Sequence, residues 1–208
     1  AAGTYTVTIT DANNCTATIS ATVTQPTALN PSVTTTPVSC FGGNNGTIDL
    51  TVTGGTPGYT YNWGAGQPTT QDRTGLAAGT YTVTITDANN CTATISATVT
   101  QPTALNPTVV ATNVSCFGGN TGAIDLTVTG GTPNYTYVWS ANAGSATTQD
   151  VSGLPIGVYT VTITDANNCT ATISATVTQP TPLTPTVSVT DVKCFGGNDG
   201  AVDLTVSG

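Results

Sequence analysis

The chain has 208 residues, no His, 6% charged residues and a formal net charge of −8. All ten acidic residues are Asp, and the two basic residues, Arg73 and Lys193, lie far apart in the sequence. This composition excludes a basic nucleic-acid-binding surface, and it excludes His-dependent catalysis and His metal ligation. No apolar run is long enough to span a membrane, so we expect no membrane insertion.

The sequence repeats itself almost without change. Residues 3–31 are identical to residues 79–107, and residues 5–27 recur as residues 159–181. We therefore expect a window cut from a longer tandem array. The predicted parts are the C-terminal part of a repeat (1–30), two complete immunoglobulin-like repeats (31–106 and 107–184) and the N-terminal part of another repeat (185–208).

The first half of a complete repeat predicts two strands. The first covers residues 33–39, and a turn rich in Gly and Asn follows at residues 41–46. Residues 47–53 alternate, with Ile48, Leu50 and Val52 on one face. Alternation with a period of two is typical of a half-buried strand.

The second half predicts an aromatic strand, a weak middle region and a strong hairpin. Tyr59, Tyr61 and Trp63 share one face, and residues 69–76 form the weak region. Residues 80–86 and 92–100 alternate around the loop Asp87-Ala88-Asn89-Asn90. Short strands with turn signals every 8–12 residues favour an antiparallel sandwich. The predicted fold class is all-β: tandem immunoglobulin-like antiparallel β-sandwiches with seven strands each, in an extended array.

The aromatic side chains of these strands are expected in the sandwich cores, since strand-three aromatics normally fill such a core. An alternative is that Tyr59, Tyr61 and Trp63 form a platform on which sugars stack. The candidate core aromatics are Tyr61, Trp63, Tyr81, Tyr137, Trp139 and Tyr159.

Six cysteines recur at equivalent positions: Cys15, Cys40, Cys91, Cys116, Cys169 and Cys194. Without His or a Cys-x-x-Cys motif, a zinc site is not expected, and an even number of cysteines would favour disulfides if the protein is exported. Cys40–Cys91 would lie within one repeat, and Cys40–Cys169 would join two repeats. The first pair conflicts with a sandwich whose first turn and last hairpin lie at opposite ends. Free thiols, bonds to another chain and the pair Cys15–Cys40 are further alternatives.

The loops beginning at Asp87 and Asp165 are weak calcium candidates. Calcium prefers six to eight oxygen ligands, usually with several carboxylates, and each loop supplies one. An Asx turn is the expected role of both residues. We expect no other metal and no cofactor.

Four motifs resemble the SprB repeat of large Bacteroidetes surface proteins. They are VSCFGGNNG (38–46), DLTVTGGTP (49–57), YTYNW (59–63) and GTYTVTITD (79–87), and they recur along the chain. The resemblance implies an adhesin exported by type IX secretion, placed outside the outer membrane and often linked to gliding. Gly58 and Asn134 stand where that family often has a second Pro.

We therefore expect a stalk or filament of a large secreted cell-surface adhesin, serving attachment or gliding, and not an enzyme. Near-identical repeats present the same surface many times, which suits a fibre better than a unique catalytic cavity. The expected partners are neighbouring repeats, identical chains in a fibre and a surface polysaccharide. The alternative is a glycan-binding repeat that uses exposed loops or aromatics.

Overall fold

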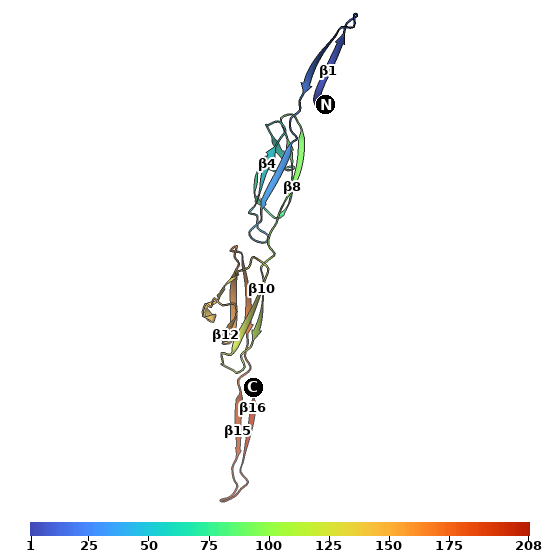
Figure 1. The fold of residues 1–208 in the computed structure, drawn as a ribbon. Helices are drawn as coiled ribbons and strands as arrows, with labels where there is room; N and C mark the ends of the chain where they lie inside the picture. The colour runs from blue at the N-terminus through green and yellow to red at the C-terminus, as the bar shows by residue number, and fades with distance from the viewer. The chain divides into compact units, whose positions relative to one another are not determined.

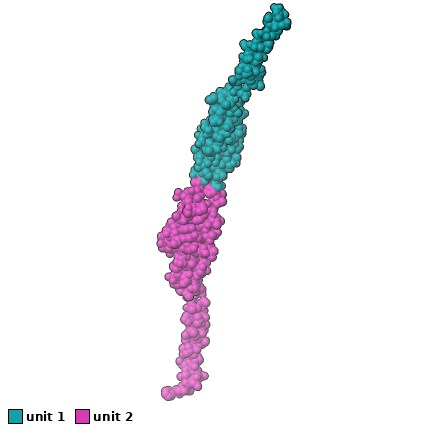
Figure 2. Space-filling model, viewed as in Figure 1, with its two compact units in different colours: residues 1–38, 42–101 teal, residues 39–41, 102–208 magenta.

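The computed structural model describes residues 1–208, and nearly all of its regular elements are strands. One short 3-10 helix, Ala141–Ala143, is the only helical element. The chain divides into two compact units, shown in Figure 2: residues 1–38 with 42–101, and residues 39–41 with 102–208. The fold contains no helix with the length and apolar character that a membrane span requires.

A β-sandwich of two three-stranded antiparallel sheets forms in the first unit (Figure 1). Its core comes from alternating positions: Ile48 and Leu50 on one sheet, and Val83, Ile85 and Val99 on the other, are each at most 1% exposed. The intervening Thr and Asp side chains face solvent, as expected for a period of two. The sheets are β3 (Asn30–Thr36), β4 (Gly46–Thr53) and β6 (Arg73–Leu76), in the order β3-β4-β6, and β5 (Thr60–Asn62), β7 (Gly79–Thr86) and β8 (Thr92–Val99), in the order β5-β7-β8.

The second unit repeats this sandwich. Ile124, Leu126, Val161, Ile163 and Val177 fill its core, each at most 1% exposed. One sheet has the order β12-β10-β9 and the other β11-β13-β14. The strands are β9 (Asn106–Thr112), β10 (Gly122–Thr129), β11 (Thr136–Trp139), β12 (Val151–Leu154), β13 (Gly157–Thr164) and β14 (Thr170–Val177). The fold class is thus all-β, with one antiparallel sandwich per complete repeat.

Each sandwich has six strands, so the expectation of seven was wrong. The difference lies after Trp63, where Gly64 and Gly66 adopt positive φ angles of 110° and 73° and the chain turns. Pro68 follows and has no N–H to donate to a ladder. The weak middle region contributes only the short strand β6.

Two hairpins lie outside the sandwiches. β1 (Gly3–Thr10) pairs with β2 (Thr16–Val23), and β15 (Thr184–Thr190) pairs with β16 (Ala201–Ser207); every residue of these four strands is exposed. Val7 is 56% exposed in β1, while Val83 at the same position of β7 is 0% exposed. Within residues 1–208 these hairpins therefore have no second sheet over their apolar faces.

Hydroxyl pairs line the outer face of the β7–β8 hairpin. Thr82 and Ser96 oxygens are 2.8 Å apart, and Thr80–Thr98 and Thr84–Thr94 are 3.1 Å and 3.3 Å apart. Such cross-strand pairs contribute about 0.2–1 kcal/mol each. These hydroxyl pairs help to keep β7 and β8 in register on a face that carries almost no charge.

Candidate functional site

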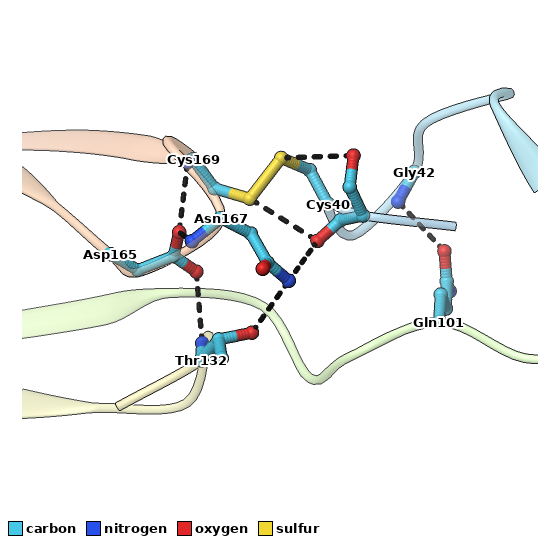
Figure 3. Close-up of a disulfide and its surroundings, with 8 residues drawn as sticks. Cys40, Gly42, Gln101, Thr132, Asp165, Asn167 and Cys169 are labelled. Atoms are coloured by element: carbon cyan, nitrogen blue, oxygen red, sulfur yellow. Dashed lines mark hydrogen bonds between the residues drawn. A yellow bond between two sulfur atoms is a disulfide. The ribbon is translucent and has the colours of Figure 1, made fainter. Parts of the chain in front are cut away.

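A disulfide joins Cys40 to Cys169 (Figure 3). Their Cα atoms are 5.7 Å apart across a sequence separation of 129 residues. Cys40 follows the first strand of the first complete repeat, and Cys169 lies in the last hairpin of the second. Of the alternatives left open by the sequence, the bond joining consecutive repeats is the one present, so neither Cys40–Cys91 nor Cys15–Cys40 forms.

The other four cysteines, Cys15, Cys91, Cys116 and Cys194, are free and exposed. Residues 39–41 belong with the second unit, although the residues before and after them belong with the first. The bond therefore lies within the second unit and connects it to a turn that the sequence assigns to the preceding repeat.

The loop that carries Cys169 is shaped by its own backbone. Asp165 N donates to the Cys169 carbonyl at 2.9 Å, and Asn168 N donates to the Asp165 carbonyl at 3.0 Å. Asn168 has a φ of 63°, a left-handed conformation that Asn tolerates better than most residues. This tight loop fixes the direction of the Cys169 side chain.

Asn167 connects the loop to the segment carrying Cys40. Its Nδ2 donates to Thr132 Oγ1 at 2.9 Å, as Figure 3 shows. The same Nδ2 donates to the Ser39 carbonyl at 3.0 Å. Cys169 Sγ lies 3.4 Å from the same Ser39 carbonyl oxygen. The side chain of Asn89, the equivalent residue of the first unit, makes only the corresponding bond, from Nδ2 to Thr56 Oγ1 at 2.8 Å. The additional Asn167 contact is thus specific to the loop that forms the disulfide.

Asp165 organises this loop from a buried position at 4% exposure. Its Oδ1 accepts hydrogen bonds from Asn167 N and Cys169 N, and its Oδ2 accepts one from Thr132 N, each at 2.9 Å. Burial alone would raise the pKa of Asp165, but the three backbone N–H groups outweigh it and lower the pKa below its usual value.

The Asp87 carboxylate accepts the three equivalent backbone hydrogen bonds. The donors are the N–H groups of Thr56, Asn89 and Cys91. The Thr56 N–H is the largest cause of the lowered pKa of Asp87, and burial opposes it. Both calcium candidates thus have both carboxylate oxygens occupied by backbone donors, and each forms the expected Asx turn. No group of three or more His, Cys, Asp or Glu side chains is arranged to hold a metal ion.

The candidate aromatics all pack on the two cores. Trp63, Trp139 and Tyr159 are at most 9% exposed, and Tyr61, Tyr81 and Tyr137 are partly buried against the same clusters. The indole N–H groups donate to the carbonyls of Thr70 at 2.8 Å and Thr148 at 3.0 Å. Desolvation raises the pKa of Tyr61 and Tyr137. Tyr59 also packs on the core, and its hydroxyl donates to the Gly54 carbonyl at 2.6 Å. A sugar platform on this strand is therefore not formed.

Sequence reasoning missed the phenylalanine that follows each first-turn cysteine. Phe41 is 59% exposed and Phe117 is 56% exposed. Phe41 lines a cavity of about 420 Å³ together with Cys40, Leu105, Asp165 and Cys169. The Cys-Phe pair could have drawn attention in the sequence, because an apolar residue in a Gly- and Asn-rich turn has no place in a sandwich core.

The family model for the SprB repeat matches residues 32–68, 108–144 and 186–208. These three segments of the chain are SprB repeats. Each matched SprB segment contains a first-turn cysteine and the phenylalanine after it. Among curated proteins, none matches the chain.

Several solved structures are similar to this chain. Three N-terminal domains of the bacteriophage RB49 highly immunogenic outer capsid protein are 21% identical, with 87% of this chain and 70% of that chain covered and a TM-score of 0.43. The amphioxus IgVJ-C2 molecule is 14% identical, with 60% and 91% covered and a TM-score of 0.30. The C-terminal fragment of intimin, solved with the Tir intimin-binding domain, is 19% identical, with 88% and 59% covered and a TM-score of 0.33. These TM-scores are low, so the description of the fold rests on the strand pairing given above.

Proposed function

We propose that this chain is a non-catalytic structural segment of an extracellular adhesin, in which disulfides between consecutive repeats carry mechanical load. SprB repeats are found in cell-surface proteins. Attachment or gliding is the activity that such a segment would serve, and type IX secretion is the export route that the family resemblance suggests.

The observation that carries the proposal is the bond between Cys40 and Cys169. A covalent bond between consecutive repeats has no use in a module that binds its ligand alone. It is useful where neighbouring repeats must stay connected under tension. The burial of Trp63 and Trp139 supports this role over the glycan-binding alternative, because aromatics at most 9% exposed offer no stacking surface.

Two experiments test this function. In cells that produce the protein, antibodies against the repeats should label intact cells, and added protease should remove the label. Labelling only after permeabilisation would overturn the extracellular location.

The load-bearing role is tested by pulling single chains from residues 1 and 208. With the disulfide intact, the 129-residue separation between Cys40 and Cys169 should contribute no extension. Reduction, or Cys40→Ser, should add roughly 450 Å at about 3.5 Å per residue. Equal extensions before and after reduction would contradict a load-bearing bond.

A further inference from the structure

The guanidinium of Arg73 is buried without a counter-charge. Arg73 begins β6 and is 8% exposed. The one ion pair of residues 1–208 joins Lys193 to Asp199, so no carboxylate neutralises Arg73. The neighbouring Asp72 carboxylate instead accepts a hydrogen bond from Leu50 N at 2.9 Å. Buried charges in proteins are normally paired, because taking an unpaired charge out of water is costly, and Arg73 lacks such a partner.

The sandwich itself does not require this arginine. In the second unit Val151 occupies the equivalent position in the strand and is also 8% exposed. The aspartate that precedes it, Asp150, accepts the same backbone hydrogen bond as Asp72. Both sandwiches therefore close in the same way, one with a charged residue at this place and the other with an apolar one. A buried charge that the fold does not need points to a ligand.

One terminal nitrogen of the guanidinium has a partner and the other has none. Nη2 donates to Gln67 Oε1 at 2.9 Å, whereas Nη1 is buried without a hydrogen-bond partner. The Trp63 ring centre lies 5.4 Å from Arg73 Cζ. An aromatic ring contacts the face of a guanidinium, and acceptors bind along its edge. The contact with Trp63 thus leaves the edge available for two parallel hydrogen bonds from Nη1 and Nη2.

The segment that carries Gln67 has little packing of its own. Residues 64–72 are all exposed. A Cβ placed on Gly64 or Gly66 would meet nothing within 4 Å. Segments with few buried apolar contacts open at a low cost in free energy. Gln67 can therefore turn away from Arg73 while the core of the sandwich stays packed.

We propose that Arg73 is the centre of a carboxylate-binding site. The carboxylate takes the place of the Gln67 amide oxygen and accepts hydrogen bonds from Nη1 and Nη2 together. Its negative charge neutralises the buried guanidinium, and Nη1 gains the partner that it lacks. Without the ligand, Gln67 satisfies only Nη2, and the unpaired donor lowers the stability of the first unit.

The chemistry of the site favours a carboxylate over a halide or a neutral ligand. Two oxygens in one plane match the two donors at the edge of a guanidinium, whereas a halide offers a single centre. The Gln67 amide oxygen already occupies the place of one of these two oxygens. A neutral ligand would leave the buried charge uncompensated.

The carboxylate belongs either to a free small acid or to an acidic sugar of a polysaccharide, since both bring the same group to the same pair of donors. Only the first unit has the site, because Val151 replaces the arginine in the second. This site adds a ligand to the structural role proposed above and does not depend on that role.

The first experiment follows the side chain of Arg73 directly. Arg73 is the only arginine of the chain, so its Nε–Hε resonance is identified without ambiguity in isotope-labelled protein. The chain, with its disulfide intact, is titrated just below neutral pH with sodium acetate and, in parallel, with sodium chloride at equal ionic strength. Acetate should shift the resonance saturably, and chloride should not. The absence of a saturable shift, or an equal shift with chloride, would overturn the proposal.

Two variants of the covering segment test the exchange of Gln67 for the ligand. Gln67→Ala removes the competing acceptor, so the acetate concentration at half-saturation should fall about fivefold, as expected for one net hydrogen bond. Thr69→Ala changes an exposed residue of the same segment and should leave that concentration unchanged. Equal concentrations for the two variants would contradict the proposed exchange.

A third variant, Arg73→Val, introduces the residue of the second unit and removes the site. Acetate affects the stability of proteins in general, so the natural chain and Arg73→Val are compared at each acetate concentration. Acetate should raise the melting temperature of the first unit more in the natural chain than in Arg73→Val. Equal rises in the two proteins would show that the effect does not come from Arg73.

Sodium glucuronate and glucose identify the source of the carboxylate. Glucose has no carboxylate and should give no saturable shift of the Arg73 resonance; a shift equal to that with glucuronate would overturn the proposal. Half-saturation at a lower concentration of glucuronate than of acetate would assign the site to an acidic polysaccharide, and the reverse order would assign it to a free small acid. None of these results affects surface labelling or the force measurement on single chains, so the two proposals are tested separately.

Discussion

Cys40 and Cys169 lie 129 residues apart in the sequence, with their Cα atoms 5.7 Å apart. A bond of this kind restricts the unfolded chain, and in the chain-entropy model a loop of this size contributes up to about 5 kcal/mol. Cys169→Ser should therefore lower the free energy of unfolding of the second unit by a few kcal/mol, measured by urea denaturation of dilute monomer. Cys91→Ser removes a free, exposed thiol and is the control. Equal denaturation midpoints for both variants would contradict a stabilising bond.

We expect the stability of the second unit to depend on pH through the carboxylate of Asp165. Its pKa is lowered in the folded state, so the unfolded state binds the proton more tightly. The stabilisation is complete above the unfolded pKa of about 3.9 and is lost as the pH falls toward the lower, folded pKa. Asp165→Asn should be less stable than the natural chain at neutral pH and should lose less of its melting temperature on acidification. Asp191→Asn removes a charge at an exposed position and should keep the natural pH profile. If the melting temperatures of the natural chain and of Asp165→Asn fell equally on acidification, this role of Asp165 would be contradicted.

The first unit has a buried Arg73 where the second unit has Val151, and we expect this difference to affect the stability of the two units. It is 8% exposed, its Nη1 is buried without a hydrogen-bond partner, and its guanidinium lies 5.4 Å from the Trp63 ring centre. Val151 occupies the equivalent position of the second unit and is equally buried at 8% exposure. An unsatisfied buried donor costs about 1–3 kcal/mol, which exceeds the cation–π gain of about 0.5–1 kcal/mol for a modest contact.

We therefore expect Arg73→Val to melt at the same or a higher temperature than the natural chain. The reciprocal change, Val151→Arg, should lower the melting temperature of the second unit. A loss of more than about 1 kcal/mol in Arg73→Val would mean that stacking on Trp63 outweighs the buried donor.

Gly54 and Gly66 form a matched pair for substitution. Both have positive φ, 72° and 73°, but a Cβ on Gly54 would clash with the Ala28 carbonyl, whereas a Cβ on Gly66 would meet nothing within 4 Å. Gly66→Ala should cost about 1–2 kcal/mol for the left-handed conformation alone. Gly54→Ala should cost clearly more, because the backbone of residue 28 must also move. Calorimetry on the two variants compares them, and equal losses would rule out the steric contribution.

The parts of the fold that could be predicted are the strands in which apolar and polar residues alternate along the sequence. Residues 80–86 were predicted as a strand and form β7 (Gly79–Thr86), since Val83 and Ile85 must both face the core. The seventh strand could not be excluded from the sequence, because turns at Gly64 and Gly66 depend on backbone angles that alternation does not encode.

The site was predictable only in part. Spacing placed Cys40 and Cys169 in loops, but the pairings Cys40–Cys91, Cys40–Cys169 and Cys15–Cys40, free thiols and bonds to another chain all remained open, because the choice depends on which loops meet in space. The burial of Arg73 was not foreseen either. A lone cation in a weak strand normally faces water, and its position over Trp63 arises only when both sheets have closed.

The hydroxyl pairs on the outer strands have a consequence for where such a protein can work. Thr82 and Ser96 hold neighbouring strands through neutral groups, and dissolved ions screen charges rather than neutral hydroxyls. The one ion pair, Lys193 with Asp199 at 3.9 Å, joins two exposed side chains and adds little. The cross-strand hydroxyl contacts would therefore stabilise these sheets to the same extent in nearly salt-free water as at the ionic strength of sea water.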